Sequence, residues 1–236
     1  MSDSVADESA RVRRLLDAQD RAARLFDEIE HRGLIRAGAG ERECSDEIRD
    51  LAESMFGVKQ HWHRRIVRAG ENTLLPFAER PPDRIIADDD IVFCDLGPIF
   101  ERWEADFGRT FVLGGADAGP DKLALRDALP KVWRAGRDYF DGHADITGAE
   151  LYDHVVELAA AAGFGFASPI AGHLLGEFPH KKISGDGVRS YIAPGSTAPM
   201  RRLDRSGRPC HWILEVHLLD PGRRFGGFYE ELLDLP

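Results

Sequence analysis

The chain has 236 residues, of which 43% are hydrophobic and 31% charged, and its formal net charge is −10 at pH 7. A chain of this length can bury one sizeable core, so we expect a single domain over residues 1–236. The acidic charge excludes nucleic acid as an expected partner, because holding a phosphate backbone requires lysine and arginine clustered on one face.

The N-terminal residues and the cysteines bear on the compartment. The first residues show neither a basic nor an apolar signal region, and no stretch approaches the roughly 18 apolar residues that a membrane-spanning helix needs. Cys44, Cys94 and Cys210 form neither a CxxC pair nor an even set, which favours a reducing compartment over a disulfide framework. We therefore expect a cytoplasmic protein without an export signal or a membrane partner.

Two helices are expected before any strand. Over residues 5–34 apolar side chains recur at helical spacing between charged ones, and the glycines of residues 33–40 supply a break. Ser45 is a suitable first residue for a second helix that ends at Phe56. The N-terminal helices should therefore occupy about residues 5–57.

The rest of the chain alternates between strand and helix patterns. Apolar runs bounded by turn residues predict strands at residues 61–67, 85–86, 91–94, 103–113, 212–218 and 228–233. Helical periodicity occurs between them at residues 121–140 and 151–162. This order suggests two α/β halves that contribute strands to one curved sheet.

Five residues in apolar surroundings have the character of metal ligands. They are Asp95, Asp106, His173, Glu215 and Glu230. A buried carboxylate is costly unless it is paired or coordinates a metal. Either aspartate alone is more simply a capped or salt-bridged turn residue, so the argument depends on the whole set. Oxygen ligands with one imidazole suit two divalent ions of Mn, Co, Zn or Fe, and the residue types do not choose among these metals.

The order of these residues resembles that of the pita-bread metallopeptidases, the superfamily of creatinase, methionine aminopeptidase and Xaa-Pro aminopeptidase. Residues 66–72, Ile-Val-Arg-Ala-Gly-Glu-Asn, also look like the IVxxGxN strand and turn of that family, and Arg109 and Thr110 follow the second aspartate. The resemblance spans most of the chain. It implies a pita-bread fold of class α/β (α+β), with two pseudo-symmetric halves around a curved antiparallel sheet, in the short form without a creatinase-type N-terminal domain.

The resemblance also implies a role for each ligand. Asp95 would chelate one ion, Asp106 and Glu230 would bridge both ions, and His173 and Glu215 would complete the second ion. The implied activity is that of an aminopeptidase or dipeptidase, in which a metal-bridging hydroxide attacks the amide of a small peptide or a related C–N substrate. A homodimer is a further expectation.

The expected catalytic residue is His180. It stands seven residues after His173, as the second substrate-facing histidine of the family does, and would steady the tetrahedral intermediate. Lys181 replaces the acidic residue commonly found beside that histidine, and Val216 and His217 replace the usual Pro-Gly after the first glutamate.

The sequence departs from the family most clearly at Phe77, where peptidases of this type carry a substrate-contacting histidine. His63 or His217 could supply the missing contact, so we place His63, Phe77 and His217 in the substrate pocket. An alternative is that His61 and His63, two residues apart on a strand, hold a single metal. A surface or pocket-lining role is the more ordinary interpretation of that pair.

A second class of function also stays open. Proteins of this fold can be non-catalytic binding proteins or metalloenzymes with different small-molecule chemistry. Retention of all five expected ligands favours metal-dependent chemistry.

Overall fold

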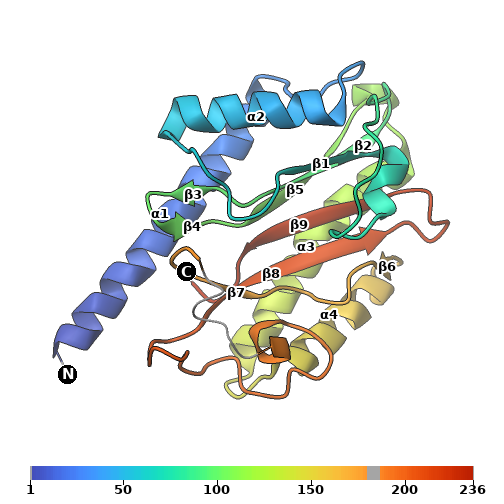
Figure 1. Ribbon diagram of the computed structural model, residues 1–236. Coiled ribbons are helices and arrows are strands. Elements are labelled where there is room, and N and C mark those ends of the chain that lie inside the picture. Colours follow the sequence, from blue (N-terminus) through green and yellow to red (C-terminus); the bar gives the residue numbers. More distant parts are fainter. Residues whose placement is uncertain (1, 180–186, 236) are drawn as a thin grey trace.

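The computed structural model describes residues 2–179 and 187–235 (Figure 1). The helices in these ranges are α1 (Ser2–His31), α2 (Glu41–Phe56), α3 (Pro120–Gly142) and α4 (Gly148–Ala161). The strands are β1 (Ile66–Ala69), β2 (Ile91–Leu96), β3 (Ile99–Phe100), β4 (Trp103–Glu104), β5 (Phe107–Val112), β6 (Gly165–Phe166), β7 (Leu174–Leu175), β8 (His211–Leu219) and β9 (Gly226–Leu232). Short 3₁₀ turns occupy Gly70–Leu74, Gly115–Asp117 and Gly187–Ser190.

The main sheet has the strand order β1-β2-β5-β9-β8-β6, and β7 pairs with β8 beside it. Each of these pairs is antiparallel. Strands β3 and β4 form a separate hairpin. The expected α/β fold with an antiparallel sheet is therefore confirmed. Among the described residues, no helix combines the length and apolar character needed to cross a bilayer.

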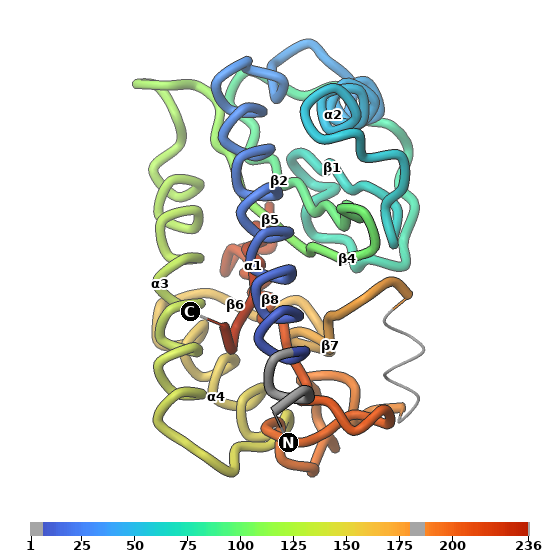
Figure 2. Tube along the Cα trace, turned by 90° about the vertical axis from the view of Figure 1, so that its left-hand side faces the viewer, coloured from blue at the N-terminus to red at the C-terminus, as the bar shows by residue number. Residues whose placement is uncertain are grey.

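Helices α1 and α3 cover one face of the main sheet, and Figure 2 shows them running along the same side of it. In α1, the ring centroid of Phe26 lies 5.1 Å from that of Phe107 in β5. In α3, Trp133 Nε1 donates a hydrogen bond to Leu214 O of β8 at 2.9 Å. The helical period places the apolar side chains of each helix on one stripe, which the sheet then buries.

The apolar core has two main parts, which correspond to two halves of the chain. One part joins α1 and α2 to the helix-facing side chains of β1 and β2. The other joins α3 and α4 to the alternate side chains of β8. Because strand side chains alternate between faces, the remaining residues of these strands point to the opposite side of the sheet.

The two halves meet where β5 lies beside β9. Gly108 pairs with Glu230 across this junction. Thr110 Oγ1 donates to Phe228 O at 2.9 Å and accepts from Phe228 N at 2.8 Å. Arg109 Nη1 donates to Glu230 O at 3.0 Å. Side chains of β5 therefore supplement the backbone pairing between the halves.

The predicted helix boundaries need one clear correction. Helix α2 begins at Glu41, not at Ser45. Gly40 takes an extended conformation as the N-cap residue, and its N–H donates to the Glu43 carboxylate at 3.4 Å. The acidic first turn starts the helix earlier than the serine would, because negative side chains there complement the free N–H groups.

The predicted strand boundaries also need correction. Residues 61–65 are not part of β1, since their segment is bonded to the β2–β3 connection through Trp62 N, which donates to Gly97 O at 2.9 Å. Ile85 forms only an isolated bridge with Gly40. The single strand predicted at 103–113 is divided into β4 and β5.

The packing of α1 gives a stability prediction. Leu25 is fully buried, so Leu25→Ala should lower the free energy of unfolding by about 2–5 kcal/mol through lost burial and a residual cavity. Leu203 is 63% exposed, and Leu203→Ala should change stability by less than about 0.5 kcal/mol. Urea unfolding of both variants measures the difference. Equal effects would show that α1 is not packed as described.

Candidate metal centre

Three of the expected ligands lie in one row across the sheet, on the face opposite the helices. Asp95 of β2 pairs with Gly108 of β5, Gly108 pairs with Glu230 of β9, and Glu230 pairs with Glu215 of β8. Residues directly opposite one another on antiparallel strands project to the same face. The register therefore brings the carboxylates of Asp95, Glu230 and Glu215 together.

Gly108 leaves the space that this row requires. A Cβ atom built on it would lie 2.4 Å from Phe228 Cδ1 and 3.2 Å from Glu230 Cβ. No side chain fits there without displacing its neighbours. The glycine thus leaves room for the Glu230 side chain beside Asp95 and Glu215.

Asp106 and His173 enter from segments next to the strands. Asp106 immediately precedes β5 and is buried. His173 Nε2 lies 3.2 Å from Asp106 Oδ2 and 3.8 Å from Glu215 Oε1. Gly172 has φ +135°, and a Cβ on it would lie 2.1 Å from Ile213 O, so a glycine is required where this segment runs along β8. All five expected ligands are therefore neighbours.

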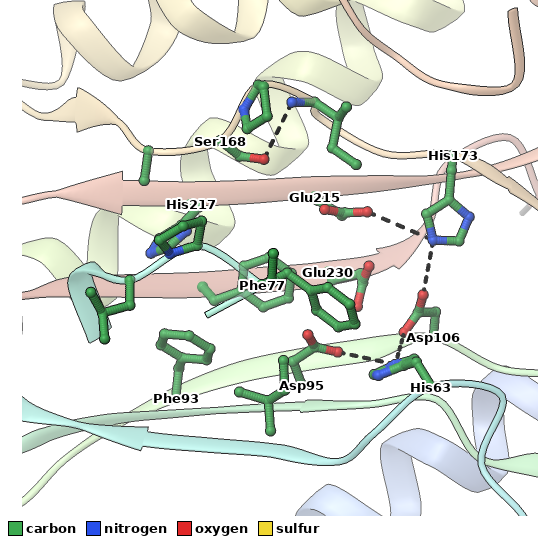
Figure 3. Close-up of a pocket in the computed structure, with 18 of the residues that line it drawn as sticks. His63, Phe77, Phe93, Asp95, Asp106, Ser168, His173, Glu215, His217 and Glu230 are labelled. Atoms are coloured by element: carbon green, nitrogen blue, oxygen red, sulfur yellow. Dashed lines mark hydrogen bonds and ion pairs between the residues drawn. The ribbon is translucent and has the colours of Figure 1, made fainter. Parts of the chain in front are cut away.

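His63 joins the same cluster, whereas the sequence placed it in the substrate pocket or, in the alternative, in a single-metal site with His61. Its Nε2 lies 3.3 Å from Asp95 Oδ1 and 3.2 Å from Asp106 Oδ1. Figure 3 shows His63 and His173 on either side of Asp106. The cluster therefore contains two imidazoles and four carboxylates.

Burial and mutual repulsion control the protonation of these carboxylates. Burial raises the pKa of Asp95 to about 6 and that of Glu215 to about 8. Burial, with the charges of Asp106 and Glu215, raises the pKa of Glu230 well above its usual range. Burial alone would raise the pKa of Asp106 too, but His63 and His173 lower it to about 2.

The neighbouring carboxylates favour the protonated, charged form of the two imidazoles. Burial disfavours the imidazolium of His63, but the charges of Asp95 and Asp106 outweigh it and raise its pKa to about 9. For His173, the hydrogen bond and charge of Asp106 likewise outweigh burial, and its pKa also rises to about 9. Without another cation, protons on these groups reduce the repulsion in the cluster.

The residues present fit divalent metal ions. Donor atoms of His63, Asp95 and Asp106 lie within 4.8 Å of one another, as do those of Asp106, His173 and Glu230. Asp106 belongs to both groups. Glu230 Oε2 is buried without a hydrogen-bond partner among the described residues. A cation between these oxygens would satisfy that atom and remove the need for protons.

The cluster lies at one end of a cavity of about 440 Å³. Figure 3 shows Phe93 and His217 at the end away from His173. Apolar residues form much of the remaining wall, namely Ile66, Leu75, Pro76, Phe77, Ile170 and Phe228. The expected pocket residues His63, Phe77 and His217 all line this cavity.

Two other histidines were considered from the sequence. His180 lies outside the described residues, so its catalytic role stays a prediction. His61 forms a bridge with Pro98, and residues 62–63 form a bend, so the strand needed for a His61–His63 metal site is absent here. His61 Nε2 is buried without a hydrogen-bond partner in the described ranges, and His61 belongs to neither donor cluster found there.

A family model for metallopeptidase family M24 matches residues 13–202, which is more than half of the chain. The chain therefore belongs to metallopeptidase family M24, and its family is metal-dependent. The matched range contains Asp95, Asp106 and His173, whereas Glu215 and Glu230 lie beyond its end. No match was found among curated proteins.

Solved structures show the same pita-bread fold. The chain is similar to a dipeptidase from Pyrococcus horikoshii OT3 (TM-score 0.73, 22% identity), an X-Pro aminopeptidase from Thermotoga maritima MSB8 (0.74, 20%) and a prolidase from Thermococcus sibiricus (0.70, 22%). These matches cover 94%, 95% and 97% of this chain but only 56%, 58% and 59% of those chains, respectively. The chain thus spans less than two thirds of their length.

The raised pKa values predict how the stability of metal-free protein depends on pH. The pKa values of His63 and His173 rise from 6.5 to about 9, and that of Glu215 rises from 4.5 to about 8. The folded protein therefore binds more protons than the unfolded chain between pH 6.5 and 9, and its free energy of unfolding should fall as pH rises through this window. His61 and His217, with pKa values lowered to about 4 by burial, act in the opposite sense only below pH 6.5.

Urea unfolding of chelator-treated protein at several pH values measures this dependence. Glu215→Gln removes one titrating group and should make the fall shallower. A free energy of unfolding that stays constant or increases between pH 6.5 and 9 would contradict the assigned electrostatics.

Proposed function

We propose that this chain is a two-metal peptidase, of the aminopeptidase or dipeptidase type, that hydrolyses small peptides. The observation that carries the proposal is the convergence of four carboxylates and His173 at one end of a cavity, with Glu230 Oε2 left without a partner among the described residues. The names of the similar solved proteins, dipeptidase, X-Pro aminopeptidase and prolidase, support peptides as the substrate class.

We propose the following division of the ligands. Asp95 would hold one ion, Asp106 and Glu230 would serve both ions, and His173 and Glu215 would complete the second. The position of Asp106 in both donor clusters supports its bridging role. Bound divalent ions of Mn, Co, Zn or Fe would supply water activation and polarisation of the substrate carbonyl.

The chain's own residues would select and orient the substrate. Ile66, Phe93 and Phe228 form a buried apolar cluster that lines the cavity, so an apolar substrate side chain suits it. Arg68 is buried, and its guanidinium donates to Pro76 O at 3.1 Å and Glu79 O at 2.9 Å. These bonds hold the segment that carries Phe77.

Neither nearby histidine is well placed to replace the donor missing at Phe77. His217 Nε2 lies 2.9 Å from Thr73 O, to which it must donate because a carbonyl only accepts. Burial lowers the His217 pKa to about 4, so the neutral ring has no second N–H to offer. The Nε2 atom of His63 faces Asp95 and Asp106. The pocket therefore supports altered, weaker peptidase activity.

Metal analysis and peptide hydrolysis test the proposed function together. The purified chain should bind about two divalent ions and cleave members of a dipeptide panel that includes Met-Xaa and Xaa-Pro substrates. Asp106→Ala should lose most of the metal and the activity, because a bridging carboxylate serves both ions. Asp117→Ala, which alters an exposed aspartate, is the control and should retain both.

Elemental analysis after dialysis and rates measured with added Mn²⁺ or Co²⁺ give the result. A parent protein that binds no divalent metal would refute the metal centre. Normal metal content with no hydrolysis of any dipeptide would favour the alternative, a non-peptidase function on the same fold.

Phe77 gives a separate prediction about rate. Phe77→His restores an imidazole donor and should raise kcat/KM on dipeptides by up to about 10²-fold, since one such donor is worth this much in other active sites. Phe77→Leu is the matched control, because it stays apolar and offers no donor. Equal gains in both variants would show that space limits the parent enzyme, and no gain in either would show that the histidine is not needed.

A further inference from the structure

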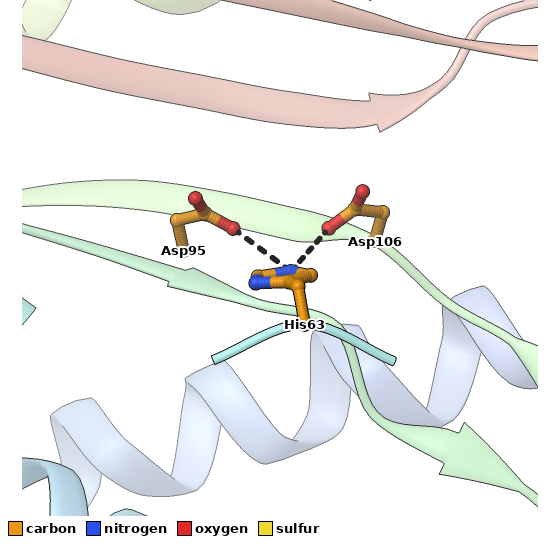
Figure 4. Close-up of side chains that lie close together, drawn as sticks. All are labelled: His63, Asp95 and Asp106. Carbon is orange, nitrogen blue, oxygen red and sulfur yellow. Dashed lines mark hydrogen bonds and ion pairs between the residues drawn. The ribbon is translucent and has the colours of Figure 1, made fainter. Parts of the chain in front are cut away.

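His63 occupies a ligand position that the resemblance to the pita-bread metallopeptidases does not assign. Figure 4 shows its ring between Asp95 and Asp106, with Nε2 at 3.3 Å and 3.2 Å from their Oδ1 atoms. One donor atom from each of these side chains lies within 4.8 Å of the other two. Three donors at such spacing can surround a single cation with small adjustments.

The backbone holds His63 and His173 in the same way. His63 Nδ1 lies 2.6 Å from Arg64 O, and His173 Nδ1 lies 2.8 Å from Leu174 O. A carbonyl only accepts, so each Nδ1 carries a proton, and in a neutral ring the Nε2 lone pair faces the carboxylates. Metal-bound histidines are commonly oriented by such a bond from the second ring nitrogen.

Contacts of the neighbouring residues Trp62 and Gly97 fix the position of the His63 imidazole. Trp62 N donates to Gly97 O at 2.9 Å, and Trp62 Nε1 donates to Ala105 O at 3.2 Å. A Cβ on Gly97 would lie 2.3 Å from His63 Cδ2, so a side chain there would displace the imidazole. The His63 side chain is only 5% exposed, which leaves little of it for contact with substrate.

We propose that His63, through Nε2, is an additional protein ligand of the ion held by Asp95 and Asp106. The inference rests on the two-metal centre proposed above and adds a ligand to it. Each ion then has one imidazole, from His63 or from His173. Imidazole suits Co²⁺ and Zn²⁺ better than it suits Mn²⁺. His63 should therefore make the binding position that it shares with Asp95 and Asp106 prefer Co²⁺ and Zn²⁺ over Mn²⁺.

Paramagnetic proton NMR of the Co²⁺-loaded protein tests the inference directly. Unpaired electrons of Co²⁺ shift the signals of bound imidazoles far outside the normal range. The Nδ1 protons of His63 and His173, which their backbone carbonyls protect from rapid exchange, should each give a shifted signal in H₂O that is lost in D₂O. His63→Ala should remove one signal, whereas His61→Ala, a control from the same segment, should remove neither.

The outcomes separate this inference from the proposed function. A single shifted imidazole signal, lost in His173→Ala but kept in His63→Ala, would overturn the role of His63 and leave the metal centre intact. A protein that binds no Co²⁺ would overturn the metal centre itself. If His63→Ala does not fold, the number of shifted signals in the parent protein decides the question.

Calorimetric titration with Co²⁺ and with Mn²⁺ adds a second measurement. Loss of a direct ligand should weaken Co²⁺ binding in His63→Gln by at least about 10²-fold, since removal of a mere supporting group costs 10- to 100-fold. Mn²⁺ binding should weaken less. Unchanged Co²⁺ affinity in a folded His63→Gln protein would refute ligation by His63.

Discussion

Four carboxylates lie together in a buried cluster, and the electrostatic repulsion among them is the constraint on which the site depends. Asp95, Glu230 and Glu215 share one row of the sheet, and Asp106 adjoins it. Ionised together in a low-dielectric site, these groups oppose folding unless positive charge joins them. The two imidazoles supply some of that charge, and divalent ions in the proposed centre would supply more. The arrangement therefore favours cation binding over maximal stability of the metal-free chain.

The alternation of side chains along the strands allows one sheet to carry both a core and this cluster. In β8, Leu214 and Val216 pack toward α3 and α4, while Glu215 points to the cavity. A shift of the pairing by one residue would place the glutamate in the apolar core and a core residue in the cavity. Burial of the helix-facing side chains thus fixes the register that aligns the carboxylates, so fold and site depend on the same pairing.

The sequence predicted most of the helices, because helical periodicity is local. It also singled out Asp95 and Glu215, as carboxylates inside apolar strands, and the structure brings both into the cluster. It placed His63 in the pocket but did not predict that this residue would lie between Asp95 and Asp106. That residue lies 3.2 Å from Asp106 and follows Trp62, whose hydrogen bonds to Gly97 O and Ala105 O join segments distant in the sequence. Its spacing from His61 suggested a strand instead. Likewise, Ser45 resembled a helix start, but the contacts of Gly40 and Glu43 begin α2 earlier.

The proposed metal centre lies at the junction between the two halves of the chain. Asp95, Asp106 and His63 come from the first half, whereas His173 and Glu230 come from the second. Gly108 is the β5 residue whose backbone pairs with Glu230, and the absence of a side chain on it leaves room for Phe228 and Glu230. Ions shared by both groups of ligands would therefore link the halves across this junction. Ions that bind only when the two groups of ligands are aligned would stabilise that alignment. Metal binding and the alignment of the two halves are therefore thermodynamically linked.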